Sequence, residues 1–266
     1  MLVPFWIIVV ASLSSEQSIA TRGYRLFVND FSLEAYKFIA SQGTVFRAYG
    51  VSLFVTLVGT AIAVTITTMM AYAISRRYFK YRNFFAFAAY FTMLFSGGLV
   101  PWYIQVSQLG LRDTIWALIL PMVFSPFNML LIRNFLRSLP EEMIESAKID
   151  GANEYRTFIQ IVLPLALPGL ATITLFYMLA FWNDWWLALN FITDPNLFPL
   201  QFLLRQVLSK VSFAVSGMQD QPALGTIPAE TVRMATTILT VGPIIFVYPF
   251  IQKYFIKGIM VGAIKG

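Results

Sequence analysis

The chain has 266 residues; 58% of them are hydrophobic, only 12% are charged, and the mean hydropathy is +0.70. This composition excludes an ordinary soluble domain and indicates an integral membrane protein. The sequence contains no Cys and no His, which excludes thiol and imidazole catalysis and most zinc sites, so we predict no catalytic residue and no metal site. It also lacks a Gly-rich phosphate loop ending in Lys and Ser or Thr, so we do not expect this chain to hydrolyse nucleotide.

Apolar stretches long enough to cross a membrane recur along the chain. About 20 residues are needed to span the ~30 Å hydrocarbon core of a bilayer. The expected spans are residues 46–74, 84–106, 114–135, 165–191 and 231–255. Residues 1–13 are apolar but too short to span alone, and they lack the basic leader of a signal peptide. We interpret them as the outer part of a first span whose beginning precedes this sequence.

The charged residues indicate the orientation of these spans. The loops near residues 76–82, 133–156 and 253–265, assigned to one side, hold 11 Lys and Arg against five Asp and Glu, a balance of +6. The other side holds the remaining eight bases and eight acids. By the positive-inside rule, the basic side, with the C-terminus, is cytoplasmic. Topology therefore accounts for the net charge of +6, and no nucleic-acid partner is needed.

A charged loop, residues 137–164, lies between two apolar spans on this basic side. Ser138 and Glu141 have the spacing of a capping box at the start of a helix. Gly151 suits the end of that helix, because Gly readily adopts the left-handed backbone conformation, and Asn153 suits the cap of a second helix. We expect a short helix, a tight turn and an amphipathic helix below the membrane, rather than a plain linker.

The same loop resembles the EAA loop of ABC-importer permease subunits. Glu145, Ala147 and Gly151, and the Ile-x-Leu-Pro ending at residues 161–164, stand at the family's spacing. Ser146 replaces the first alanine of the motif, which exchanges one small residue for another. The resemblance implies a coupling helix that docks on an ATPase subunit. The residues implied in this coupling are Glu145, Ser146, Ala147, Asp150, Gly151 and Ala152.

Three further segments resemble carbohydrate-importer permeases of the maltose type. Residues 249–266 and 182–185 (Trp-Asn-Asp-Trp) resemble that group, and residues 96–102 resemble a branch that handles pectin- or alginate-type oligosaccharides. The implied fold is all-α and integral to the membrane, a type I ABC-importer permease with about six transmembrane helices, the first incomplete here. We expect one membrane domain over residues 1–266. Its parts are a partial first span and external loop (1–45), core spans (46–255), the coupling loop (137–164) and a cytoplasmic tail (256–266).

The resemblance also implies partners. These are a second permease, forming a heterodimer, two ATPase subunits that bind ATP and Mg, and an extracytoplasmic solute-binding protein; this chain itself would hold no cofactor. Two long external segments, residues 14–45 and 193–230, suit docking of the binding protein, although ordinary packed loops are the alternative. The tail, through Lys257, Gly262 and Lys265, is expected to reach the ATPases, and the alternative for it is a frayed end.

Candidate residues for the saccharide pathway are polar or aromatic groups at broken or terminal parts of spans: Ser125, Asn128, Trp182, Asn183 and Asp184. Polar groups there can line a water-filled cavity, and aromatic rings can stack on sugars. The alternatives are interfacial anchoring for the tryptophans and helix packing for the other groups. Asp184 would repel a uronate, so the residues themselves do not indicate an anionic cargo.

The sequence therefore predicts a permease subunit, multi-pass in the bacterial cytoplasmic membrane, of an ATP-driven importer that works by alternating access. The expected cargo is an oligosaccharide, including uronic-acid-containing fragments. An importer for another small solute, such as amino acids or peptides, is the alternative within transport. A membrane enzyme is disfavoured by the absence of His, Cys and a buried acid pair, and a channel would leave the loop after residue 135 unexplained.

Overall fold

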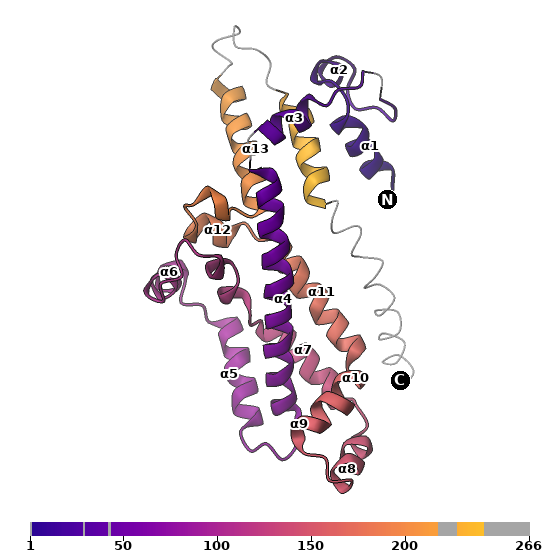
Figure 1. Cartoon of the computed structure of the whole chain (residues 1–266), viewed down its shortest axis with the longest axis vertical. Coiled ribbons are helices and arrows are strands. Elements are labelled where there is room, and N and C mark those ends of the chain that lie inside the picture. The colour runs from indigo at the N-terminus through magenta and orange to yellow at the C-terminus, as the bar shows by residue number, and fades with distance from the viewer. Residues whose placement is uncertain (1, 29, 42–43, 218–227, 242–266) are drawn as a thin grey trace. The chain divides into compact units, whose positions relative to one another are not determined.

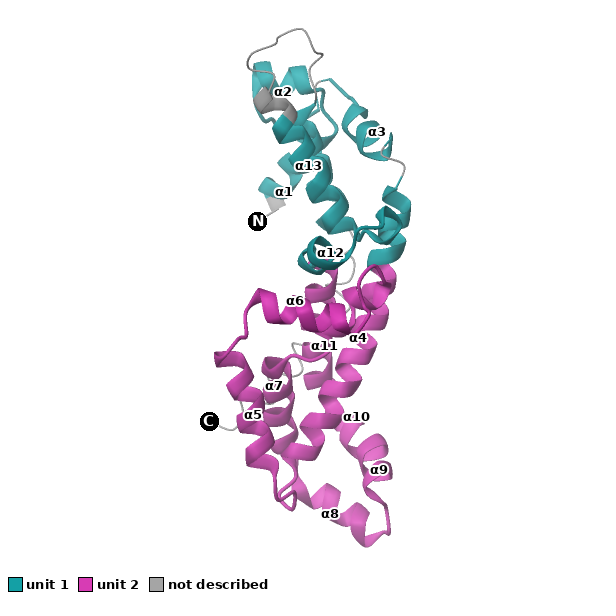
Figure 2. Ribbon diagram, turned by 90° about the vertical axis from the view of Figure 1, so that its left-hand side faces the viewer, with its two compact units in different colours: residues 1–52, 184–247 teal, residues 53–183, 248–266 magenta. Residues whose placement is uncertain are grey.

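The computed structural model describes residues 2–28, 30–41, 44–217 and 228–241 (Figure 1). Within these residues the secondary structure is helical, apart from one isolated antiparallel bridge between Ser14 and Phe31. The chain forms two compact units (Figure 2). Unit 1 comprises Met1–Ser52 and Asp184–Val247, and unit 2 comprises Leu53–Asn183 and Tyr248–Gly266.

Unit 1 joins the N-terminal helices to segments late in the sequence. Its helices are α1 (Leu2–Ser12), α2 (Glu16–Arg22), α3 (Glu34–Ser41), the first turns of α4 (Val45–Ser75), α12 (Trp186–Phe191), the 3-10 turn η4 (Pro195–Leu197), α13 (Leu200–Gly217) and a helix over residues 229–241. The Glu16 carboxylate accepts hydrogen bonds from the backbone N–H groups of Glu230 and Thr231, both at 2.9 Å. Because an acid at a helix N-terminus satisfies otherwise unpaired N–H groups, Glu16 fixes α2 to the start of the last described helix.

Unit 2 carries the sites of interest. After α4 it contains α5 (Arg82–Leu94), α6 (Leu99–Gln108), the 3-10 turns η1 (Ile115–Leu118) and η2 (Leu120–Met122), α7 (Pro126–Arg137), α8 (Glu141–Ile149), α9 (Glu154–Thr157), the π-helical turn η3 (Phe158–Val162), α10 (Leu163–Leu165) and α11 (Leu167–Asn183). Helix α7 packs against both α5 and α11. Its core residues Met129 and Ile132 are completely buried, as is Ile173 of α11.

Two glycines allow close packing in unit 2. A Cβ added at Gly169 of α11 would lie 2.9 Å from side-chain atoms of Ile132 and Phe135 on α7. A Cβ at Gly59 of α4 would lie 2.7 Å from the ring of Phe181 on α11. Small residues at such contacts are a common feature of membrane helix packing.

The expected spans are largely present as broken helices. Among the described residues, α4 alone is long and apolar enough to cross a membrane, and up to four spans result if each of three bent helix pairs is one span. The pairs bend by 117° between α5 and α6, by 49° between Ile115–Met122 and α7, and by 80° between Glu154–Leu165 and α11. The expected span 231–255 extends beyond the described residues, so only its first part can be compared.

The breaks have local causes in the sequence. Gly98, with φ of +85°, separates α5 from α6, and Pro126 begins α7 after its own break. Glycine readily adopts a positive φ, and proline is favoured at the first position of a helix, so both residues suit a break in an apolar segment. The expected span over residues 165–191 contains α11, which ends at Asn183, and α12, which begins at Trp186.

Candidate functional site

The start of the candidate coupling helix, α8, differs from the expectation. Ser138 does not cap α8; its Oγ donates to the carbonyl of Phe135 at 2.7 Å and so belongs to the end of α7. Pro140 occupies the N-cap position without a side-chain hydrogen bond. Glu141 and Glu142 lie in the first turn, where carboxylates are stabilised by the positive end of the helix dipole. The predicted capping box was wrong because Ser138 ends the preceding helix.

The end of α8 matches the expectation. Gly151 has φ of +78°, the left-handed conformation that residues with a Cβ rarely adopt. Its N–H donates to the carbonyl of Lys148 at 3.0 Å, and the N–H of Ala152 donates to that of Ala147 at 2.9 Å. These two bonds form a Schellman motif, which satisfies carbonyls that would otherwise lack partners. A Cβ at Gly151 would meet no atom of the described residues within 4 Å, so these residues leave the space above this turn open.

The second part of the loop also begins as expected. The Asn153 side chain caps α9, accepting a hydrogen bond from the backbone N–H of Arg156 at 2.8 Å. The helix then widens into the π-helical turn η3 before Pro164. Val162 is completely buried, whereas Tyr155 is 74% exposed. The loop is therefore a helix, a tight turn and an amphipathic helix.

The six residues implied in coupling differ in exposure. Glu145, Ser146, Asp150 and Gly151 are exposed and Ala152 is half-buried, but Ala147 is 7% exposed and packs inside the chain. Ile149, which is 86% exposed in the last turn of α8, was not among the predicted residues. In the sequence, this isoleucine directly precedes the Asp-Gly turn, and nothing in the pattern required its side chain to be buried. The outer surface of the turn thus presents an exposed apolar side chain beside small residues.

An ionic network holds α8 to its neighbours. The Lys148 ammonium lies 2.7 Å from the Glu154 carboxylate and 4.2 Å from the centroid of the Tyr78 ring. Tyr72 donates its hydroxyl to Glu154 at 2.8 Å. Desolvation alone would raise the pKa of Glu154, but hydrogen bonds from Lys148, Tyr78 and Tyr72 outweigh it and lower the pKa to about 2. Burial and the hydrogen bond to Glu154 raise the pKa of Tyr78 to about 12.

Two candidate pathway residues belong to one hydrogen-bonded cluster in unit 2. Ser125 caps α7 by accepting from the N–H of Asn128 at 3.4 Å, and its own N–H donates to the Tyr177 hydroxyl at 2.9 Å. That hydroxyl lies 2.6 Å from the hydroxyl of Thr67 on α4. We call Thr67, Ser125, Asn128 and Tyr177 the hydroxyl cluster. Asn128 is 5% exposed and Tyr177 2%, so the cluster is enclosed. Thr67 and Tyr177 were missed, although each is a polar group inside an apolar segment.

The other three candidates have local structural roles. Trp182 is buried, with 5% of its surface exposed. The Asn183 amide donates to the carbonyl of Leu179 at 2.8 Å, within the end of α11. The Asp184 carboxylate accepts from the N–H of Leu187 at 3.1 Å and so caps the start of α12. The printed hydrogen bonds of Asn183 and Asp184 thus go to backbone groups close to them in the sequence.

A further cation in unit 1 was also missed. The Arg205 guanidinium lies over the Trp185 ring, 3.6 Å from its centroid. Trp186 contacts Trp185 edge-on, with centroids 5.6 Å apart, and is 43% exposed. Such an arginine on an aromatic face combines a charge with a stacking surface. It was hidden in the sequence because 20 residues separate the arginine from the tryptophan.

Residues 38–261 match a known family, the inner membrane components of binding-protein-dependent transport systems. The chain belongs to this family. The family is one of transport-system components, and this member is accordingly a membrane protein of a transport system. This chain, as a member of the family, has a helical fold, an exposed loop between α7 and α11, and broken spans.

Individual relatives agree with this assignment. This chain is 45% identical to Protein LplC of Bacillus subtilis (strain 168), over 100% of its own length and 90% of that protein. It is 41% identical to the polygalacturonan/rhamnogalacturonan transport system permease protein YtcP of the same strain, over 99% of this chain and 92% of the relative. A crystal structure of a bacterial ABC transporter that imports the acidic polysaccharide alginate matches with a TM-score of 0.85 and 29% identity, covering 96% of this chain and 90% of that one. These matches confirm the expected type I permease fold.

Proposed function

We propose that the chain is the permease subunit of an ATP-driven ABC importer that carries oligosaccharides, including uronic-acid-containing fragments, into the cell by alternating access. The observation that carries the proposal is the similarity, along nearly the whole chain, to a permease named for polygalacturonan and rhamnogalacturonan transport. The likeness to a transporter of the acidic polysaccharide alginate supports the same cargo class. Importers of amino acids or peptides are disfavoured because these relatives are named for polysaccharide transport.

The proposed complex contains a second permease, two ATPase subunits that bind ATP and Mg, and an extracytoplasmic solute-binding protein. The exposed tip of the coupling loop, Ile149 with Gly151, supports docking on an ATPase, since an apolar side chain beside open space fits into a surface cleft. Glu145, Ser146, Asp150 and Ala152 surround this tip, while the buried Ala147 supports it from inside. The tip therefore supplies the proposed contact.

The orientation follows from the charge distribution. The loop around α8 and the C-terminal tail are proposed to be cytoplasmic, as the excess of Lys and Arg on that side supports. The tail residues Lys257, Gly262 and Lys265 lie outside the described residues, and their contact with the ATPases remains a proposal. Deleting residues 262–266 tests it: we expect weaker coupling of ATP hydrolysis to transport, and wild-type coupling would indicate a frayed end.

The saccharide pathway is proposed to pass the break before α7, where Ser125 and Asn128 interrupt an apolar segment. Asn183 and Asp184 remain candidates at the end of α11, although their side chains already bond to nearby backbone. We propose that Arg205, on the Trp185 face, supplies the positive charge that an acidic sugar requires.

The decisive experiment is uptake by proteoliposomes that contain the complete transporter, its binding protein and internal ATP. We expect oligogalacturonides to accumulate in an ATP-dependent manner, whereas amino acids and peptides do not. Accumulation of a non-carbohydrate solute alone would overturn the cargo assignment, and passive equilibration without ATP would overturn the importer.

The variant Arg205→Gln separates acidic from neutral cargo. An exposed ion pair contributes up to about 1 kcal/mol, so we expect about a five-fold lower uptake of oligogalacturonides and unchanged uptake of neutral oligosaccharides. Lys210→Gln, which removes an exposed base from the same helix, serves as the matched control. Equal losses for acidic and neutral sugars would indicate that Arg205 only packs on Trp185.

A further inference from the structure

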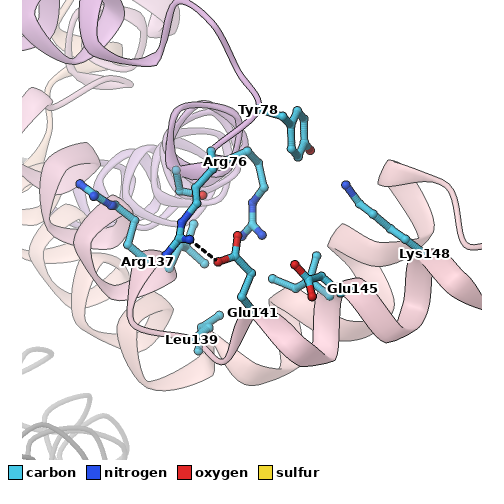
Figure 3. A pocket seen from close by; sticks show the side chains of 11 residues that line it. Arg76, Tyr78, Arg137, Leu139, Glu141, Glu145 and Lys148 are labelled. Carbon is cyan, nitrogen blue, oxygen red and sulfur yellow. Dashed lines mark ion pairs between the residues drawn. The ribbon is translucent and has the colours of Figure 1, made fainter.

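A pocket of about 290 Å³ lies where the end of α4 meets the end of α7 and the inner side of α8, within unit 2 (Figure 3). Its charged lining residues are Arg76, Arg77, Arg137, Lys148, Glu141 and Glu145. Four bases face two acids, so the lining has an excess charge of +2. A concave site with such an excess attracts anions.

Arg76 is the most unusual of these residues. It is 8% exposed, and within the described part of the chain it makes no ion pair and its Nε is buried without an acceptor. Its guanidinium lies over the Tyr72 ring, 4.5 Å from the centroid. A buried cation without a counter-charge is costly, because it loses its hydration. Residues 242–266 contain no Asp or Glu, so the side chains of the tail do not supply the missing carboxylate.

The other basic residues of the pocket differ in whether they form ion pairs. Arg77 pairs with Glu141 at 3.2 Å, and Lys148 pairs with Glu154 at 2.7 Å. Arg137, in contrast, makes no side-chain hydrogen bond or ion pair to any described residue, and it shares the pocket with Arg76. Both arginines thus line one cavity without a carboxylate partner among the described residues. An anion in this cavity would offset the cost of burying Arg76.

We propose that this pocket binds a phosphate group, carried either by an anionic lipid or by a small soluble phosphate ester. The planar guanidinium groups of Arg76 and Arg137 match the oxygens of a phosphate, to which arginine can donate two parallel hydrogen bonds. A phosphate monoester carries about −1.5 to −2 charges at neutral pH, which balances the excess of +2. The volume is at the lower end of ligand pockets, about 300 Å³, so it admits a phosphate with a small polar substituent.

The site lies against the coupling loop. Glu141, Glu145 and Lys148 belong to α8, whereas Arg76 follows α4 and Arg137 ends α7. A bound phosphate therefore connects α8 to both of these helices. If α8 docks on an ATPase, as the proposed function has it, occupancy of the pocket also changes ATPase coupling; the binding itself does not rest on that function.

Binding is tested on the assembled transporter in phosphatidylcholine nanodiscs, without nucleotide. Calorimetric titration with glycerol 3-phosphate at constant ionic strength examines the soluble source. Nanodiscs that also contain phosphatidic acid, analysed by native mass spectrometry for retained lipid, examine the lipid source. We expect saturable binding in at least one of these two arms, and the arm that responds identifies the source.

Variants locate the site. Loss of a charge-assisted hydrogen bond gives Arg137→Gln about a ten-fold weaker affinity. Arg156→Gln, which removes an exposed base of the same loop outside the pocket, leaves the affinity unchanged. Arg76→Gln should weaken binding further, and its thermal midpoint shows whether it still folds. Arg137 is exposed, so the Arg137→Gln variant still tests the site if Arg76→Gln does not fold.

Three results would overturn the proposal. The first is no saturable binding of glycerol 3-phosphate or phosphatidic acid. The second is the same loss of affinity in Arg156→Gln as in Arg137→Gln. The third is cross-linking of residue 137 to an acidic residue of an ATPase subunit in every nucleotide state, because the pocket would then hold a protein carboxylate. None of these measurements depends on sugar transport, so they separate this proposal from the proposed function.

Discussion

The tip of the coupling loop and the hydroxyl cluster use their functional groups in opposite ways. At the tip, Ile149 is 86% exposed, and a Cβ at Gly151 would meet no neighbour in the described part of the chain. In the cluster, the Tyr177 hydroxyl contacts both Ser125 and Thr67 and is enclosed. Groups that make no contact within the chain are available to a partner, whereas groups already bonded within it mainly stabilise the fold. Substitutions at the tip should therefore impair coupling, and loss of the Tyr177 hydroxyl should impair stability.

The largest effect is expected at the tip. Gly151→Val places a β-branched residue at φ of +78°, which costs about 1–2 kcal/mol or more and distorts the turn. We expect sugar-stimulated ATP hydrolysis by the reconstituted transporter to fall by about ten-fold or more, with membrane insertion unchanged. Gly151→Asn is the matched control, since asparagine tolerates the left-handed conformation, and it should keep most of the activity. Equal activity of the valine variant and the wild type would contradict the proposed role of the tip in coupling.

A smaller effect, on stability, is expected in the hydroxyl cluster. Tyr177→Phe leaves the N–H of Ser125 and the hydroxyl of Thr67 without their partner, at a cost of about 1–2 kcal/mol. The thermal midpoint of the purified transporter should fall, while the ratio of transport to ATP hydrolysis stays the same. Tyr155→Phe is the control, because Tyr155 is 74% exposed, and it should have almost no effect. If Tyr177→Phe changed the coupling ratio at unchanged stability, the Tyr177 hydroxyl would act in transport rather than in stabilising the fold.

The smallest effect concerns the network beneath the tip. Because hydrogen bonds lower the pKa of Glu154 to about 2 in the folded protein, the ionised form stabilises the fold above the ordinary pKa of about 4.5. This stability is lost as the pH falls from about 4.5 to about 2. The Glu154 side chain is 48% exposed, so solvent screening limits the contribution to about 1 kcal/mol.

The variant Glu154→Gln isolates this contribution. Between pH 6 and 3, the thermal midpoint of the wild type should approach that of the variant, since protonated Glu154 resembles glutamine. Lys148→Met, which removes the cationic partner, should reduce the same pH dependence. A constant difference between wild type and Glu154→Gln across this range would show that Glu154 contributes no pH-dependent stability.

Structural features that depend on residues close in the sequence were predictable, whereas contacts between residues far apart in the sequence were not. Gly151 and Asn153 act within one helical turn, so their backbone conformation and cap followed from residue type and spacing. Ser138 fitted two helices equally well in the sequence, and only the structure shows that it ends α7. Tyr177 and Thr67 are 110 residues apart, and no local pattern could pair them.

The candidate pathway residues show the same limit. Asp184 and Asn183 were chosen as polar groups late in a span, but polar groups at such positions also cap helix ends, and both do so here. The break between α11 and α12 inside the expected span 165–191 was not predicted for a related reason, since hydropathy does not register a short break. Arg205 on Trp185 became visible only when α12 and α13 were placed together.

Cross-linking tests the central claim most directly, namely that the exposed tip of α8 is the surface that contacts an ATPase. The chain contains no Cys, so a single introduced thiol has no background within it. Ile149→Cys, combined with a cysteine in the surface cleft of the ATPase subunit, should form a specific cross-link whose yield changes with nucleotide. Phe46→Cys places a thiol near the start of α4, at a residue that is similarly exposed (89%), and should form no cross-link. Equal or absent cross-linking from both positions would contradict the account.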